Sequence, residues 1–337
     1  MRTIVIGDIH GCYDELIELI SEINVSEEDL IIALGDIVDR GNKSKEVFQF
    51  FQNRKNSIVL MGNHERKHLQ ENLTYAQEIV KLQMDDDYED FVQWINALPI
   101  YYEDDSAKII HAYYEHDKPL TAQKLEVLIG TSSGNRYLQK KYTNATEWIL
   151  NYNDSKAIIY GHEVVGNFPK IHHNTFGIDT GCCHGGYLTA IELPQFSIHQ
   201  VKAKRDYWRE EQIKWQIPVL ETKEWNQMTF DEIEKLFSKL AYIKDLETIA
   251  YINQKLQWIE HTKSQIHTIK DSIDRLTQRM LRDTSIQFNE KANQYDFNRY
   301  LYLSKNNNLK VEILENDLNT AYKIHTLIDR LNQIEFN

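Results

Sequence analysis

The sequence contains 337 residues, with 38 Lys plus Arg against 51 Asp plus Glu, giving a formal net charge of −13. Bulk charge therefore does not draw the chain to nucleic acid or to an anionic membrane. Hydrophobic residues make up 42% of the chain, enough for a sizeable core, and the length corresponds to about two domains. Because we find no run of about 18 apolar residues and no signal peptide, we expect a soluble, cytoplasmic protein without a membrane anchor.

Glycine and proline divide the chain into two parts. All thirteen glycines lie before residue 187, and the last proline is Pro218. The composition then shifts to long stretches without either residue, which favours helices. We therefore expect a catalytic domain over residues 1–204, a linker over 205–228 and a helical domain over 229–337.

The first part alternates short β-rich runs with helical patterns. The expected pairs of strand and helix are Thr3–Ile6 with Tyr13–Ile23, Leu30–Leu34 with Lys45–Phe51, and Ser57–Leu60 with His64–Asn72. Later strands are expected at Lys108–His111, Ala157–Tyr160, Gly186–Leu193 and Ser197–Lys202, the last two as an antiparallel pair. This order predicts an α/β fold with a largely parallel sheet.

The second part shows helical periodicity. Thr229 and Glu232 form a capping-box sequence at the start of one helix. Two apolar stripes follow, over 249–280 and 311–331, separated by the polar segment 306–308. They predict a helical hairpin, a candidate coiled coil, whose first arm would be ~55 Å long at ~1.5 Å per residue. The alternative is a compact helical bundle, and Lys263 at a core-like position argues against a continuous coiled coil.

Polar side chains follow five apolar runs of the first part. They are Asp8, His10, Asp36, Asn63, His111 and His162. The carboxyl ends of parallel strands meet at one crevice, so these side chains are expected to lie together. Carboxylate, amide and imidazole donors suit manganese, iron or zinc, and the set is large enough for two ions.

The blocks that carry these residues resemble a known family. Residues 7–11 read GDIHG, residues 35–41 read GDIVDRG and residues 62–65 read GNHE. In order and spacing they resemble the calcineurin-like metallophosphoesterases, in the branch of the phosphoprotein phosphatases and the symmetrical diadenosine tetraphosphate hydrolases. The resemblance covers about residues 1–204. It implies a sandwich of two β-sheets flanked by helices, with both metals at one sheet edge. The all-α C-terminal extension is expected from the helical periodicity alone, because the resemblance does not reach it.

The resemblance also assigns ligands to two divalent ions, of which manganese is the first choice and iron or zinc the alternatives. Asp8, His10 and Asp36 would hold one ion; Asp36, Asn63, His111 and His162 would hold the other. Asp36 would thus bridge the pair. A hydroxide held by the metals would attack phosphorus in line, and no protein nucleophile would be needed.

Three further residues acquire roles from the same motifs. His64 is the candidate acid that protonates the leaving oxygen, and Asp39 would orient that imidazole and keep it protonated. Arg40 offers a guanidinium fork for phosphate oxygens. Arg136 is a candidate for a second phosphate-binding arginine.

The sequence does not decide whether the substrate is a phosphoprotein or a dinucleoside polyphosphate. Met61 stands where phosphoprotein phosphatases carry arginine, which resembles the dinucleoside-polyphosphate hydrolases. Against this, Glu65 replaces the aspartate usual in those hydrolases, Arg40 is present where they often lack it, and Tyr113 stands where glycine is expected. Tyr113 either stacks on a base or shapes the pocket.

The sequence therefore favours a metal-dependent phosphoesterase. It would hydrolyse a phosphomonoester or phosphoanhydride in a phosphorylated small molecule of nucleotide type or in a phosphoprotein. The alternative is a scaffold whose metal site is secondary and whose helical residues 229–337 bind a protein partner or a second copy of the chain. The complete ligand set argues against that alternative.

Overall fold

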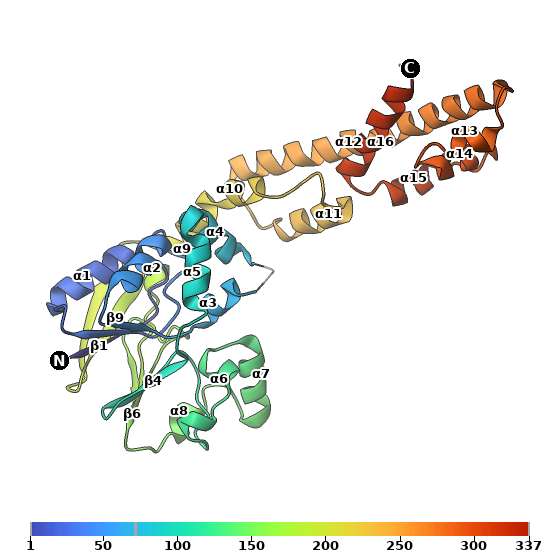
Figure 1. The fold of residues 1–337 in the computed structure, drawn as a ribbon. Coiled ribbons are helices and arrows are strands. Elements are labelled where there is room, and N and C mark those ends of the chain that lie inside the picture. Colours follow the sequence, from blue (N-terminus) through green and yellow to red (C-terminus); the bar gives the residue numbers. More distant parts are fainter. Residues whose placement is uncertain (1, 71–72, 336–337) are drawn as a thin grey trace. The chain divides into compact units, whose positions relative to one another are not determined.

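The computed structural model describes residues 2–70 and 73–335 (Figure 1). The last two residues of the helix expected over 64–72 and the end of the expected helical domain lie outside this range. Contacts divide the chain into two compact units, Met1–Val219 and Leu220–Asn337, which are described separately. Among the described residues, no helix is long and apolar enough to cross a membrane.

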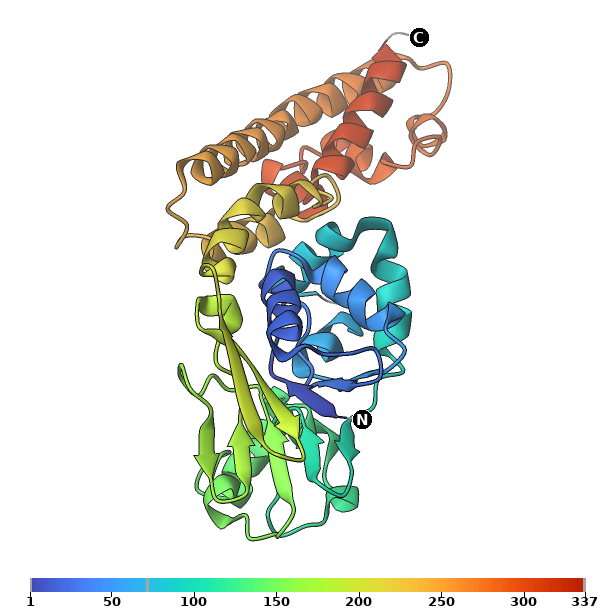
Figure 2. The same ribbon diagram turned by 90° about the vertical axis from the view of Figure 1, so that its left-hand side faces the viewer.

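The first unit contains two five-stranded sheets. The first sheet has the order β10-β9-β1-β2-β3, with strands β1 (Thr3–Ile6), β2 (Leu30–Ala33), β3 (Ser57–Val59), β9 (Tyr187–Leu193) and β10 (Ser197–Lys202). Strands β1, β2 and β3 are parallel, whereas β9 runs antiparallel to both β1 and β10. The βαβ order is confirmed, and so is the antiparallel pair of strands expected at Gly186–Leu193 and Ser197–Lys202 (Figure 2).

The second sheet has the order β4-β5-β6-β8-β7. Its strands are β4 (Tyr101–Glu103), β5 (Ala107–Ile110), β6 (Ala157–Tyr160), β7 (Lys170–His172) and β8 (Thr175–Gly177). Strands β5, β6 and β8 are parallel, and the edge strands β4 and β7 are antiparallel to their neighbours. The sequence predicted β5 and β6 but not the other three, because three residues are too few to show an alternating pattern.

Alternation along the strands produces a sandwich. Ile4 and Ile6 pack in a core under helices, whereas Val5 faces a core that residues of both sheets share. In the second sheet Ile109 contributes to this shared core and Ile110 to the core on the opposite side. Each sheet therefore buries both faces, as expected of strands followed by crossover helices. The two-sheet fold flanked by helices is confirmed.

Helices cover both outer faces of the sandwich (Figure 1). Those of the first unit are α1 (Tyr13–Ile23), α2 (Ser44–Asn53), α3 (Asn63–His68), α4 (Tyr75–Met84), α5 (Tyr88–Ile95), α6 (Leu125–Leu128), α7 (Ser132–Lys141), α8 (Trp148–Asn151) and α9 (Tyr207–Lys214). Helices α1, α2, α4 and α5 bury apolar side chains on the first sheet, and α6 and α8 on the second. The segment 205–228, expected as a linker, contains α9 and α10 (Gln216–Glu221).

The second unit is all-helical and is built on one long helix. Its helices are α11 (Phe230–Lys239), α12 (Leu246–Arg282), α13 (Phe288–Ala292), α14 (Asn298–Lys305), α15 (Val311–Asp317) and α16 (Ala321–Glu335). Thr229 and Glu232 form the predicted capping box of α11. With 37 residues, α12 is ~55 Å long at ~1.5 Å per residue. Lys263 does not interrupt it, because its ammonium pairs with Glu234 at 2.7 Å and lies 5.2 Å from the centre of the Phe230 ring.

The return from α12 differs from the expected hairpin. The chain turns directly after α12 and comes back as four separate helices, α13 to α16, all of which contact α12. The polar segment 306–308 follows the end of α14 and does not separate two long arms. The apolar stripe of α12, including Ile259, Ile266 and Ile273, is buried within this unit. Apolar spacing revealed the two stripes but not the breaks in the second, where capping and turn residues decide.

Candidate metal centre

The strand ends of both sheets meet at Asp36, which follows β2 and is 2% exposed. Its Oδ1 lies 3.5 Å from Nε2 of His111, the residue after β5. Its Oδ2 lies 3.8 Å from Nε2 of His10, which follows β1. The two oxygens of one carboxylate therefore face donors that come from different sheets.

The remaining predicted donors complete the cluster. Asn63 Oδ1 lies 3.1 Å from His111 Nε2 and 2.8 Å from His162 Nδ1. Both carboxylate oxygens of Asp8 accept from the backbone N–H of His162, at 3.2 and 3.1 Å. The ligand atoms of Asp36, His111 and His162 all lie within 4.8 Å of one another. The structure thus brings the six donors predicted from the sequence to one edge of the sandwich.

Contacts with backbone carbonyl groups fix the tautomer and orientation of two of the imidazoles. Nδ1 of His10 lies 2.9 Å from the carbonyl of Val38, and Nδ1 of His111 lies 3.0 Å from that of Leu34. Each Nδ1 therefore carries its proton, and the lone pair of each Nε2 faces the site. Burial lowers the pKa of His10 and of His111, and lowers that of His162 to about 3. All three rings are neutral and available as ligands.

The backbone around the site is close-packed and strained. A Cβ on Gly62 would lie 2.2 Å from Asp36 Oδ1, and one on Gly161 would lie 2.0 Å from Asp8 Oδ1. Only glycine allows the carboxylates to approach this closely. His10, Asp36 and His162 all have positive φ, at 47°, 49° and 72°. Such conformations cost about 1–3 kcal/mol each and gather at functional sites.

His64 and Asp39 form a buried pair beside this cluster. His64 Nδ1 lies 2.5 Å from Asp39 Oδ2, while its Nε2 lies 3.9 Å from Asp36 Oδ2. Burial opposes ionisation of Asp39, but the imidazoles of His68 and His64 hold the pKa of this carboxyl well below its usual range. The carboxylate therefore orients His64 with one ring nitrogen turned toward the metal cluster, as the sequence predicts.

The two predicted arginines lie in different surroundings. The guanidinium of Arg40 bridges two imidazoles, with nitrogens 3.1 Å from His10 Nε2 and 3.0 Å from His64 Nε2. Arg136 is exposed on α7. Its neighbour Asn135 contacts the site, because its side-chain amide donates to the hydroxyl of Tyr113 at 3.1 Å.

Tyr113 shapes the wall of the site. It is buried, its ring lies edge-on to His162 with the centroids 5.2 Å apart, and its hydroxyl donates to Glu163 at 2.5 Å. Of the two roles left open by the sequence, these contacts favour shaping the pocket over stacking on a base.

Sequence reasoning missed two acidic residues of the site. Asp179 follows β8, and burial together with the charge of Asp36 raises its pKa to about 6. Glu65 accepts from the backbone N–H groups of Asp36, Ile37 and Gly62 at 2.8 to 3.0 Å. Burial and the Asp36 charge raise the pKa of Glu65 to about 8. The position of Asp179 after a strand could have indicated that it lies at the site. For Glu65 the sequence offered only its position in the third motif.

The charge of the site fits divalent cations. Five carboxyl groups are buried there, those of Asp8, Asp36, Asp39, Glu65 and Asp179. Among the side chains of the site described above, Arg40 is the one that carries a permanent positive charge. Oxygen and imidazole donors of this kind are ligands that suit manganese, iron or zinc, and a bound cation would favour the ionised form of the carboxyl groups. The residues present therefore fit the metal ions that the motifs imply.

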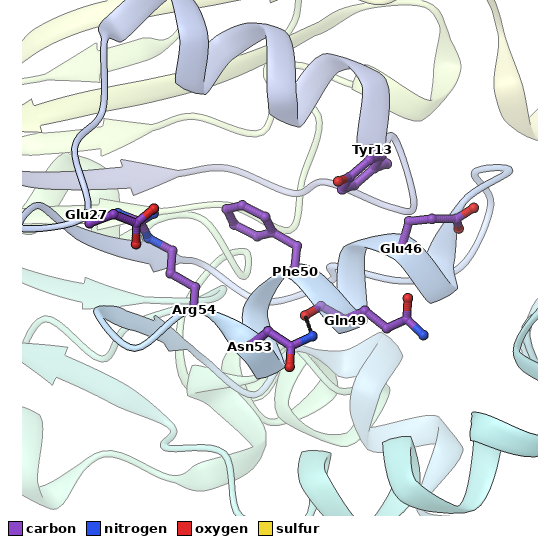
Figure 3. A pocket seen from close by; sticks show the side chains of 7 residues that line it. All are labelled: Tyr13, Glu27, Glu46, Gln49, Phe50, Asn53 and Arg54. Atoms are coloured by element: carbon purple, nitrogen blue, oxygen red, sulfur yellow. Dashed lines mark hydrogen bonds and ion pairs between the residues drawn. The ribbon is translucent and has the colours of Figure 1, made fainter.

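The first unit also contains surface pockets away from this cluster. One of about 380 Å³ lies between α1 and α2, and Figure 3 shows Tyr13 and Phe50 beside it. Its lining shares no residue with the metal site. Its cation Arg54 is paired with Glu27 at 3.4 Å, so it offers no free charge for a phosphate.

Comparison with known proteins agrees with the fold of the first unit. The chain matches the model of the calcineurin-like phosphoesterase family over residues 1–166. The asymmetrical bis(5'-nucleosyl)-tetraphosphatase PrpE of Halalkalibacterium halodurans is 30% identical over 242 residues, 61% of this chain and 95% of that protein. PrpE of Bacillus subtilis is 30% identical over 234 residues, 60% of this chain and 95% of that protein. A solved metallophosphoesterase from Sphaerobacter thermophilus is 14% identical, with a TM-score of 0.42, over 64% of this chain and 94% of that one.

The chain therefore belongs to the calcineurin-like metallophosphoesterases, which are metal-dependent hydrolases. The curated relatives that it matches are named as asymmetrical tetraphosphatases, whereas the motifs resembled the symmetrical hydrolases of the same branch. Those relatives are matched over 95% of their length by about three fifths of this chain. About two fifths of this chain lies outside each of these matches.

Proposed function

We propose that this protein is a two-metal phosphoesterase that hydrolyses a phosphoanhydride bond of a dinucleoside polyphosphate. The observation that carries the two-metal part is the position of Asp36, whose Oδ1 faces His111 and whose Oδ2 faces His10. A carboxylate that presents one oxygen to each of two donor groups is suited to bridge two cations.

The proposed ligands form two groups, one for each ion. Asp8, His10 and Asp36 hold one ion, and Asp36, Asn63, His111 and His162 hold the other, with manganese as the first choice. Bound there, the two ions supply Lewis-acid activation of the attacking water and of the phosphoryl oxygens. Asp179, which lies beside Asp8 and Asp36, adds negative charge that favours cations in the first group.

The surrounding side chains act on the substrate itself. Arg40 binds the phosphoryl oxygens, because its charged fork lies between His10 and His64 at the metal cluster. Once the guanidinium of Arg40 has turned from His64 Nε2 to the phosphoryl oxygens, this ring nitrogen protonates the leaving oxygen, and Asp39 holds the opposite nitrogen. Arg136 is proposed to contact a more distant phosphate of the polyphosphate chain.

Two observations favour a nucleotide over a phosphoprotein. Met61 removes the arginine that phosphoprotein phosphatases carry before the third motif, and it is buried. The similar proteins are named for the hydrolysis of bis(5'-nucleosyl) tetraphosphates in the asymmetrical manner. We therefore propose asymmetrical cleavage, which releases a nucleoside triphosphate and a nucleoside monophosphate.

The test is a substrate panel with added manganese. Diadenosine tetraphosphate, p-nitrophenyl phosphate and a phosphopeptide are supplied to the full chain, and nucleotide products are separated by anion exchange. We expect the dinucleotide to be the best substrate and to give ATP and AMP in equal amounts. Two molecules of ADP would show symmetrical cleavage, and preference for the phosphopeptide would reject the nucleotide substrate. The Asp36→Asn variant is the control for contaminating phosphatases.

A further inference from the structure

Asp39 is contacted by two imidazoles instead of one. His64 Nδ1 lies 2.5 Å from its Oδ2, and His68 Nε2 lies 3.0 Å from its Oδ1. The side-chain amide of Gln77 also donates to Oδ2. The carboxylate is fully buried, so these three groups replace its hydration and leave it no alternative orientation.

His68 is itself held in one state. Its Nδ1 lies 3.0 Å from the hydroxyl of Tyr88, and its ring lies edge-on to the rings of Tyr88 and Phe91 with centroids 5.7 and 5.1 Å away. Because the carboxylate of Asp39 can only accept, Nε2 of a neutral His68 carries the proton and Nδ1 accepts from Tyr88. The donors therefore run in one direction, from Tyr88 to His68 to Asp39.

The two imidazoles come from one short helix. His64 and His68 are four residues apart on α3, so they lie on the same face and meet the two oxygens of a single carboxylate. Loss of the His68 contact would leave Asp39 Oδ1 buried without a donor. The carboxylate would then be held through Oδ2 alone, by His64 and Gln77, and would orient the ring of His64 less firmly.

We propose that His68 is a positioning residue that acts on the leaving-group proton through Asp39 and His64. The proposal rests on the proposed function in one respect, the role of His64 as the acid. The motifs that identify the metal site do not include His68 or Tyr88. The consequence is specific: loss of His68 affects reactions that need a proton on the leaving oxygen and spares those that do not.

The experiment compares two aryl esters whose leaving groups differ in basicity. For the manganese-loaded full chain, kcat/KM is measured with phenyl phosphate and with p-nitrophenyl phosphate. We expect His68→Leu to lower kcat/KM about tenfold for phenyl phosphate and less than about threefold for p-nitrophenyl phosphate, a part of the effect of a general acid. His68→Gln, whose amide still donates to Asp39, is expected to restore most of the loss. Equal losses on both esters with unchanged metal content would overturn the proposal.

A double variant tests the path through His64. In a His64→Ala background, adding His68→Leu is expected to change neither ester further, because both changes act on one proton. Independent, multiplying losses would overturn the proposal. If His68→Leu fails to fold, Tyr88→Phe decides the question: it removes the donor to Nδ1 and should shift the ratio of the two esters in the same direction, whereas an unchanged ratio would reject the path.

The proposed function can fail separately. A wild-type protein that hydrolyses aryl esters but not diadenosine tetraphosphate would reject the nucleotide substrate and leave the His68 test intact. If His64→Ala lowers both esters equally, the acid role fails, and the His68 proposal fails with it.

Discussion

Asn63 and His162 come from different sheets, yet Asn63 Oδ1 lies 2.8 Å from His162 Nδ1. Asn63 begins the helix after β3, and His162 lies two residues beyond the end of β6. The contact therefore joins the carboxyl-terminal edges of both sheets at the metal cluster. A site assembled in this way depends on how the two sheets pack, because Asn63 comes from the first sheet and His111 and His162 come from the second.

Replacement of the shared carboxylate should abolish metal binding and hydrolysis together. Asp36→Asn keeps the shape of the side chain but removes the charge that faces His10 and His111. We expect loss of bound manganese and of phosphatase activity, with an unchanged circular dichroism spectrum. Chelation should inactivate the wild type, and manganese should restore it. Asp90→Asn, at an exposed position of α5, is the matched control. Near-wild-type activity of metal-free Asp36→Asn would reject the two-metal proposal.

The acid role of His64 predicts dependence on the leaving group. His64→Ala should lower the rate most for esters with basic leaving groups, since only those need a proton in the transition state. General acid catalysis typically contributes about 10²–10⁴-fold. The measurement is kcat/KM across a series of aryl and alkyl phosphates. In the variant, kcat/KM should fall more steeply with increasing basicity of the leaving group than it does in the wild type. A series parallel to that of the wild type would argue against this role.

The arginines are expected to differ in what they recognise. Arg40→Ala should lower kcat/KM for every phosphate substrate by about 10- to 100-fold, since a hydrogen bond to a charged group contributes about 1.5–3 kcal/mol. Arg136→Ala should leave p-nitrophenyl phosphate unaffected and raise KM only for the longer dinucleoside tetraphosphate. Steady-state kinetics with both substrates separate the two roles. No change on either substrate would remove Arg136 from the site.

The grouping of the six candidate donors could be predicted from the sequence because each follows a β-rich run, whereas their role as metal ligands stays a prediction. Strand order alone then brings them to one edge, as Asp8 and Asp36 illustrate. The roles of Glu65 and His68 could not be predicted, because each depends on tertiary contacts. Glu65 accepts from three backbone N–H groups, and His68 on α3 contacts Asp39, which lies between β2 and α2. Burial of a polar side chain against a distant partner leaves no periodic signal along the chain.

The same distinction applies to the helical unit. The capping box at Thr229 is local chemistry and was predicted, as was the length of α12. The return as four short helices could not be predicted, because residues 283–310 show no continuous apolar stripe. Where the sequence lacks periodicity, packing against α12 decides the path of the chain.

The capping box gives a stability prediction for the helical unit. Thr229 Oγ1 accepts from the backbone N–H of Glu232 at 3.3 Å, and the Glu232 carboxylate accepts from the Thr229 N–H at 2.8 Å. Thr229→Ala should lower the free energy of unfolding of this unit by about 1 kcal/mol. Chemical denaturation followed by fluorescence is the measurement. Thr268→Ala, at an exposed position within α12, is the control and should not destabilise. An equal effect of both changes would show that the cap contributes nothing.

The end of the catalytic unit can be located by truncation. Residues after Lys204 still pack on the first unit, because the hydroxyl of Tyr207 donates to buried Glu15 at 2.8 Å and that of Tyr75 donates to the carbonyl of Gln212 at 2.5 Å. A chain ending at Lys204 leaves Glu15 buried without its Tyr207 partner, which costs about 1–3 kcal/mol. We expect a chain ending at Val219 to keep the thermal stability of the catalytic unit and its activity on aryl esters, and the shorter chain to melt at a lower temperature.

The Val219 truncation also tests the helical unit. Among the described residues, the clusters of candidate metal ligands all lie in the first unit. We therefore expect removal of the helical unit to spare aryl ester hydrolysis while abolishing self-association or raising KM for the natural substrate. Light scattering of the full and truncated chains, run beside kinetics with diadenosine tetraphosphate, is the measurement. Monomers in both cases with identical kinetics would reject recruitment and dimerisation. The apolar face of α12, which is covered by its own unit, would then serve packing within that unit only.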